Sequence, residues 1–153
     1  MNGLNDALKL SSSQFADGAN IPARFTCKDI NVNPPLEIKG VPDSAKSLVL
    51  ILHDPDAPIG DFVHWTIWNI EPATSQIPEG ALPIGAVEGM TSFDQTGYGG
   101  PCPHAGTHHY IFELYALDSK LDLDPSTDRN ELLEAMKAHI LAQTKLAGLF
   151  SRD

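Results

Sequence analysis

The stretch Ser47-Leu-Val-Leu-Ile-Leu-His53, with His64-Trp-Thr-Ile-Trp-Asn-Ile70 after it, decides the fold class of this chain. Both runs have the length of β-strands, and Asp54-Pro-Asp-Ala-Pro58 separates them with residues that favour turns. The first run is apolar at successive positions, which indicates a strand covered on both faces by a second sheet or by helices. We therefore expect two neighbouring antiparallel strands in a buried sheet.

The rest of the first 120 residues follows the same pattern. A third strand is expected from His109 to Leu117, and the chain holds 12 glycines and 12 prolines, many of them at turn signals. Short strands separated by such turns are typical of a β-sandwich. No repeat or low-complexity linker divides the sequence, so we expect residues 1–153 to form a single domain.

The periodicity changes in the last quarter of the chain. Apolar residues recur at helical spacing at Leu132, Leu133, Met136, Ile140 and Leu141. Asp128 precedes them, and Glu131 follows it by three residues in a capping-box arrangement. We therefore expect one amphipathic helix to end the fold.

Composition restricts the partners and the location. Ten basic and twenty acidic residues give a formal net charge of -10, which argues against duplex nucleic acid and anionic bilayers. The longest aliphatic run, Leu48–Leu52, is far shorter than the roughly 20 residues of a membrane-spanning helix. The first ten residues show neither a basic nor a long apolar region of a signal peptide, so a cytoplasmic location is expected.

The two cysteines, Cys27 and Cys102, do not have the spacing of a metal site. In a cytoplasmic protein they are most simply interpreted as reduced thiols, with a structural disulfide as the alternative. Cys102 lies between two prolines in the glycine-rich segment and could instead be a reactive thiolate paired with His108.

Polar residues gather around the ends of the expected strands. If the first two strands pair, Asp54 and His64 lie at the same edge of the sheet. His108 and Tyr110 alternate by two and so point to one face. The segment Gly97-Tyr-Gly-Gly-Pro-Cys-Pro103 adds backbone N–H groups of the kind that bind anions. We therefore expect a pocket for a phosphate monoester, bound as a monoanion or against a protonated histidine, because Asp54 would repel a dianion.

Other interpretations of the same residues remain open. Asp54 and Asp56 could cap turns, and His64 could be a core histidine. The histidines and aspartates could in principle hold zinc or iron, but no His-x-His pair or helical His-x-x-x-His is present, and we expect no metal or other cofactor. An enzymatic alternative is a hydrolase of a small ester or phosphoester, with His64 or His108 as general base.

Three ordered motifs resemble the phosphatidylethanolamine-binding protein family, which includes the Raf kinase inhibitor proteins. They are Asp54-Pro-Asp-Ala-Pro58, His64-Trp65 with Asn69, and Gly97–Pro103 leading to His108-His-Tyr110. The chain is similar to the short prokaryotic branch of that family. The resemblance implies a Greek-key sandwich of two antiparallel sheets with a C-terminal helix and short peripheral helices.

The resemblance also implies a non-enzymatic protein with a small pocket for phosphate-type anions, such as phospholipid head groups or phosphorylated side chains. Regulation by contact with a kinase or protease, and pairing as a homodimer, are further implications. The ligand-binding residues that we carry over are Asp54, His64, Trp65, Gly99, Gly100, Pro101, His108 and Tyr110.

Three positions depart from the pattern of that family. His109 stands where members commonly have arginine, and His104 where they usually have proline. Phe150 falls where a tyrosine is usual near the terminal helix, which removes a hydroxyl donor. These departures place the preference for a particular ligand in question.

Overall fold

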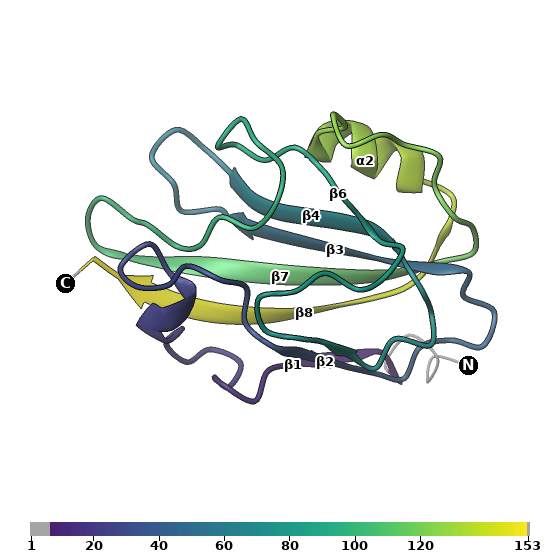
Figure 1. The fold of residues 1–153 in the computed structure, drawn as a ribbon, viewed down its shortest axis with the longest axis horizontal. Helices are drawn as coiled ribbons and strands as arrows, with labels where there is room; N and C mark the ends of the chain where they lie inside the picture. Colours follow the sequence, from purple (N-terminus) through teal and green to yellow (C-terminus); the bar gives the residue numbers. More distant parts are fainter. Residues whose placement is uncertain (1–6, 153) are drawn as a thin grey trace.

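A computed structural model describes residues 7–152 of the chain. Two antiparallel sheets pack face to face (Figure 1). The larger sheet has the strand order β6-β4-β3-β7-β8. Its strands are β6 (Val87–Glu88), β4 (Phe62–Ile70), β3 (Ser47–Asp54), β7 (Thr107–Leu117) and β8 (Ile140–Ser151). The smaller sheet consists of β1 (Lys9–Ser11), β2 (Leu36–Lys39) and β5 (Gln76–Ile77), in that order. The expected β-sandwich is confirmed.

Strand β3 is buried along its whole length, as the apolar run predicts. Its alternate side chains enter two different cores. Leu48, Leu50 and Leu52 pack between the two sheets. Val49 and Ile51 face the other way and pack with Leu132 and Met136 of helix α2 (Arg129–Met136). The central strand is therefore covered by a sheet on one side and by a helix on the other.

The expectation of a helix that ends the fold is wrong. Helix α2 begins with the predicted capping box of Asp128 and Glu131, but it ends at Met136. After Ala138, which has a φ of 68°, the chain continues as the long strand β8. Residues 140–151 include good helix formers, yet backbone pairing with β7 from Thr107↔Ser151 to Leu117↔Ile140 overrides that local preference.

Strand β4 contains an irregularity that matters for the site. Leu52 of β3 lies opposite Trp65, and His53 lies opposite Val63, so His64 is an extra residue on β4. A β-bulge of this kind breaks the alternation of side chains and directs the extra residue away from its regular face. The His64 side chain is thereby turned towards the edge of the sheet at which β3 ends.

Helix α2 has eight residues and is too short to cross a bilayer. No helix in residues 7–152 is long and apolar enough to span a membrane. A short 3₁₀ turn, Ala23–Phe25, lies near the C-terminal end of β8 (Figure 1).

Candidate functional site

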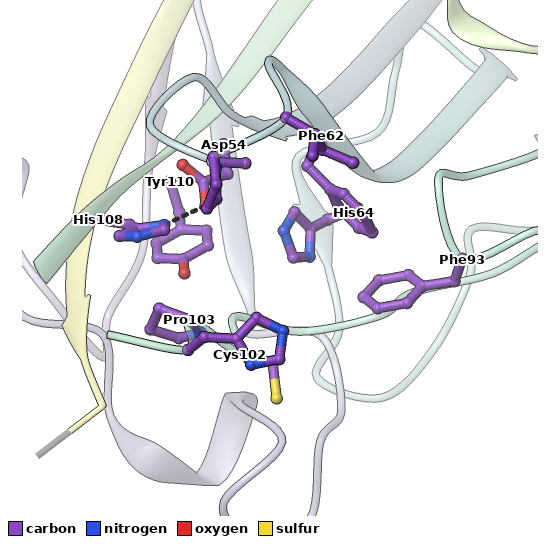
Figure 2. Close-up of a pocket in the computed structure, with 12 residues that line it drawn as sticks. Asp54, Phe62, His64, Phe93, Cys102, Pro103, His108 and Tyr110 are labelled. Carbon is purple, nitrogen blue, oxygen red and sulfur yellow. Dashed lines mark hydrogen bonds and ion pairs between the residues drawn. The ribbon is translucent and has the colours of Figure 1, made fainter. Parts of the chain in front are cut away.

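A cavity of about 500 Å³ opens where β3 ends and β4 begins. Figure 2 shows Asp54, Tyr110 and His108 on one side of it, and His64, Phe62 and Phe93 on the other. The residues that line it are Asp54, Ala57, Pro58, Ile59, Phe62, His64, Phe93, Cys102, Pro103, His104, His108 and Tyr110. Strands β3, β4 and β7 thus bring together Asp54, His64, His108 and Tyr110.

Asp54 and His108 form a closely bonded pair. Nδ1 of His108 lies 2.6 Å from Oδ2 of Asp54, and both side chains are largely buried. The other carboxylate oxygen, Oδ1, accepts the backbone N–H of Asp56 at 2.8 Å. Asp54 therefore closes a local turn, as one interpretation predicts, and also holds one histidine at the cavity.

His64 is fixed by the glycine-rich segment. Its Nδ1 lies 2.7 Å from the carbonyl oxygen of Gly99, and the N–H of Gly99 donates to the carbonyl of His64 at 3.0 Å. Because a carbonyl can only accept, the proton of a neutral ring lies on Nδ1. Burial lowers the pKa of His64 below its ordinary value, although the Gly99 carbonyl and the Asp54 charge act in the opposite direction. His64 is therefore neutral near pH 7 and offers Nε2 as an acceptor.

Tyr110 is the most unusual polar group of the cavity. Its side chain is fully buried, and its hydroxyl makes no well-formed hydrogen bond to a described residue, although the Asp54 carboxylate and the Cys102 backbone lie close to it. The ring lies against both histidines, with centroid separations of 5.4 Å from His64 and 6.3 Å from His108. Burial and the Asp54 carboxylate raise the pKa of Tyr110 well above its ordinary value, so the hydroxyl keeps its proton. A buried hydroxyl without a partner is costly, and a bound ligand would satisfy it.

Apolar side chains form the lip of the cavity. Phe62 and Phe93 meet edge to face at 4.9 Å, and Phe93 also contacts the His64 ring at 5.3 Å. Ile59 is 90% exposed at the tip of the loop between β3 and β4. No lysine or arginine lies among the lining residues. The cavity therefore combines a polar floor with an apolar entrance and has no permanent positive charge.

Four of the residues carried over from the resemblance do not line this cavity. Trp65 is buried behind it, where its Nε1 donates to Glu88 at 2.7 Å. Gly99 uses its N–H and carbonyl to hold His64, as described above, and Gly100 donates its N–H to Oδ1 of Asn31 at 2.9 Å. The carbonyl of Pro101 accepts the N–H of Cys27 at 3.1 Å. This loop supports the site, and these backbone N–H groups are not free to bind an anion.

The expectation of reduced thiols is wrong, because Cys27 and Cys102 form a disulfide. The bond joins the segment after the 3₁₀ turn to the wall of the cavity. Cys102 therefore has no thiol to act as a nucleophile with His108 in this state. Sequence spacing could not indicate the pairing, because 75 positions separate the two residues and only the fold brings them together.

The comparisons with known proteins agree with this architecture. The family model for phosphatidylethanolamine-binding proteins matches residues 11–151. The chain belongs to the phosphatidylethanolamine-binding protein family. It is 46% identical over 150 residues to a UPF0098 protein of Methanothermobacter thermautotrophicus, and the match covers 95% of this chain and 99% of that protein. A UPF0098 protein of Chlamydia trachomatis is 40% identical over 151 residues, with coverage of 95% and 100%.

Solved structures of the phosphatidylethanolamine-binding protein family are also similar. One is a putative homologue from Chlamydia trachomatis, CT736, with a TM-score of 0.93 and 39% identity over 96% of this chain and 99% of that one. Another is YbcL of E. coli, described as a member of the mammalian family, with a TM-score of 0.89 and 28% identity over 95% of this chain and 98% of that one. The predicted membership is confirmed.

The three departures from the family pattern have definite places. Phe150 lies on β8 opposite His108, not near a terminal helix as expected. His109 is exposed, and its Nδ1 lies 2.7 Å from Oδ2 of Asp56. His104 is also exposed and lines the cavity. Of the three, only His104 lines the cavity, and none is a lysine or an arginine.

Several lining residues were not among the expected ligand-binding residues. They are Ala57, Pro58, Ile59, Phe62, Phe93, Pro103 and His104, together with Cys102, which was considered at the site only as a reactive thiolate. Most are apolar residues in loops, where sequence offers no periodicity that predicts a facing direction.

In residues 7–152 no cluster of three or more His, Cys, Asp or Glu side chains could hold a metal ion.

Proposed function

We propose that this protein is a non-enzymatic binding protein whose cavity takes a phosphate-type monoanion. The observation that carries the proposal is the buried Tyr110 hydroxyl, which lines the cavity beside Asp54 and makes no well-formed hydrogen bond to a described residue. The hydroxyl can donate to an anionic oxygen of the ligand. His108, held through Nδ1 by Asp54, can donate from Nε2 when its ring carries a second proton.

His64 selects the protonation state of the ligand. With Nδ1–H directed at Gly99, its Nε2 accepts a hydrogen bond. The monoanion of a phosphate monoester carries one P–OH that can donate to this nitrogen, whereas its dianion carries none. The dianion would also meet the Asp54 carboxylate with no lysine or arginine in the cavity to balance it. The monoanion is therefore the form that the site binds.

The apolar lip adds a preference for an organic substituent. A ligand whose phosphate reaches Tyr110 would place its other end beside Phe62, Phe93 and Ile59. Phosphorylated side chains have this form, and so does a phospholipid head group released as its phosphomonoester, such as phosphoethanolamine. By analogy with the family, the output is regulatory, through contact with a kinase or protease, and the protein pairs as a homodimer.

A hydrolase is the second candidate, and the neutral His64 ring favours it, because a free Nε2 can act as a general base. No serine or threonine lines the cavity, and Cys102 is held in a disulfide. The attacking group would then have to be water. Release of nitrophenol from nitrophenyl phosphate or nitrophenyl acetate that disappears in His64→Ala would favour this activity over simple binding.

Calorimetric titration at pH 6 tests the binding function. Phenyl phosphate, phosphoethanolamine and inorganic phosphate are titrated into the wild type, His108→Gln and His139→Ala. His139 is the matched control, because it is an exposed histidine paired with Asp118 and it does not line the cavity. We expect His108→Gln to weaken binding about tenfold or more, as loss of a hydrogen bond to a charged group does, while the control binds normally. Equal heats from the wild type and His108→Gln would refute the proposal.

A cytoplasmic location belongs to the same proposal. The disulfide argues against this location, because most cytoplasmic proteins keep their thiols reduced. Fractionation of native cells, with thiols blocked before lysis, would report both the compartment and the redox state of Cys27 and Cys102.

A further inference from the structure

The Cys27–Cys102 disulfide lies between two cavities. Cys102 lines the main cavity, and both cysteines line a second cavity of about 210 Å³ on the other side of the glycine-rich loop. Asn31, Gln95 and Thr96 contribute polar groups to this side cavity. Both cysteines are exposed to solvent. A small reagent can therefore reach the bond without passing through the protein core.

In the glycine-rich loop, hydrogen bonds to the segment 23–31 hold residues 98–101, which precede Cys102. Tyr98 donates its hydroxyl to the Phe25 carbonyl at 2.6 Å, and Gly100 and Pro101 are bonded to Asn31 and Cys27. Within residues 7–152, no hydrogen bond joins positions 102–105 to the segment 23–31. Between positions 102–105 and the segment 23–31, the disulfide is thus the direct link.

The chain beyond this link forms one wall of the main cavity. Pro103 and His104 follow Cys102 directly, and both line the cavity. Figure 2 shows Pro103 and Cys102 on the side of the cavity opposite Asp54. His64, by contrast, is held by Gly99, which lies in the hydrogen-bonded part of the loop. Opening the disulfide would thus remove the covalent link of this wall to the segment 23–31 and leave the hydrogen bond that holds His64 in place.

We infer that the Cys27–Cys102 disulfide is a thiol-exchange site at which a dithiol reductant controls ligand binding in the main cavity. The thiolate of the dithiol attacks one Sγ, forms a mixed disulfide and expels the other cysteine as a thiolate, which takes a proton from solvent. The second thiol of the reductant then closes its own disulfide and releases the first cysteine. The dithiol is oxidised, and the protein gains two thiols.

The effect on the ligand rests on the proposed binding function. A wall that is mobile in the free protein must be ordered when the ligand binds, which costs affinity. We expect the reduced protein to bind phenyl phosphate about tenfold more weakly, as ordering of two side chains and their backbone would cause. Reoxidation should restore the affinity.

The first experiment treats the folded protein with dithiothreitol, without denaturant, then alkylates it with iodoacetamide and measures the intact mass. Two added carbamidomethyl groups on a protein that keeps its circular dichroism spectrum are expected. A bond that resists reduction until denaturant is added would overturn the inference. Global unfolding on reduction would also overturn it, because the bond would then stabilise the whole fold and not one wall.

The second experiment compares phenyl phosphate binding by oxidised protein, reduced protein and the double variant Cys27→Ser, Cys102→Ser. The inference is supported if the reduced protein and the double variant both bind more weakly than the oxidised protein, and if dithiothreitol does not change the affinity of the double variant. Equal affinity of oxidised and reduced protein would overturn it while leaving the binding function intact. Absence of binding by the oxidised protein would instead refute the binding function, and with it the control of binding by the disulfide.

Discussion

Nδ1 of His64 lies 2.7 Å from the carbonyl oxygen of Gly99, although 35 positions separate the two residues in the chain. The contact requires the bulge that turns His64 out of the regular alternation of β4. It also requires the glycine-rich loop to lie against the end of the strand. A backbone carbonyl thereby sets the tautomer of the imidazole that faces the cavity.

This contact predicts how ligand binding depends on pH. Phosphate monoesters lose their second proton near pH 6, so the monoanion becomes more abundant as the pH falls from 8 to 5.5. Because the pKa of His64 is lowered, its Nε2 remains an acceptor over most of this range. We expect the affinity for phenyl phosphate, measured by calorimetry, to rise as the pH falls from 8 to 5.5. An affinity that stays flat, or falls, would contradict selection of the monoanion.

Tyr110 and Tyr115 lie on the same strand and form a matched pair. The Tyr115 hydroxyl donates to Glu113 at 2.6 Å, whereas the Tyr110 hydroxyl has no described partner. We expect Tyr110→Phe to weaken phenyl phosphate binding about tenfold and to leave the free energy of unfolding unchanged or slightly higher. Tyr115→Phe should bind normally and lose about 1.5 kcal/mol of stability. Calorimetry and urea denaturation would reveal the reverse pattern if Tyr110 were merely structural.

Ile59 tests the role of the apolar lip. Ile59 is 90% exposed and lines the cavity, while Ile84 is 96% exposed and does not. Covering part of an isoleucine by a ligand is worth about 1 kcal/mol, so Ile59→Ser should weaken phenyl phosphate binding about fivefold. Binding of inorganic phosphate should not change, and Ile84→Ser should affect neither ligand. Equal losses for both ligands would show that Ile59 does not contact the organic group.

His53 predicts a pH dependence of stability on the other face of the sheet. Its Nδ1 lies 2.7 Å from Asp61, which also binds Arg129, and its Nε2 lies 3.4 Å from Glu113. Burial opposes the charged ring, but the nearby carboxylates of Glu113 and Asp61 outweigh it and raise the pKa of His53. The resulting stability is fully present below about pH 6.5 and is lost as the pH rises through the raised pKa.

The variant His53→Gln measures this contribution. At pH 6 we expect it to lower the free energy of unfolding by about 2 kcal/mol, the scale of hydrogen bonds to charged groups. The difference from the wild type should shrink as the pH rises towards 9. A difference that is constant or larger at high pH would mean that the protonated ring is not the stabilising form.

The sequence contained most of the information on the fold because strand signals are local. The run from Ser47 to Leu52 is apolar at successive positions and is flanked by turn residues, which is the pattern of a strand covered on both sides. The prediction for the end of the chain was wrong because it also relied on local signals. Residues 140–151 have helical preferences, and the register with β7 that makes them a strand is a long-range property.

The sequence alone determined that a carboxylate, two imidazoles and a phenol could lie at one polar site. Strand alternation and turn residues are properties of neighbouring positions, so they can be identified without the tertiary structure. The tertiary structure decided how they act. It placed the bulge at His64, left the Tyr110 hydroxyl without a partner and joined Cys27 to Cys102. Each of these depends on atoms that approach only after distant segments pack together, so local patterns carry no signal for them.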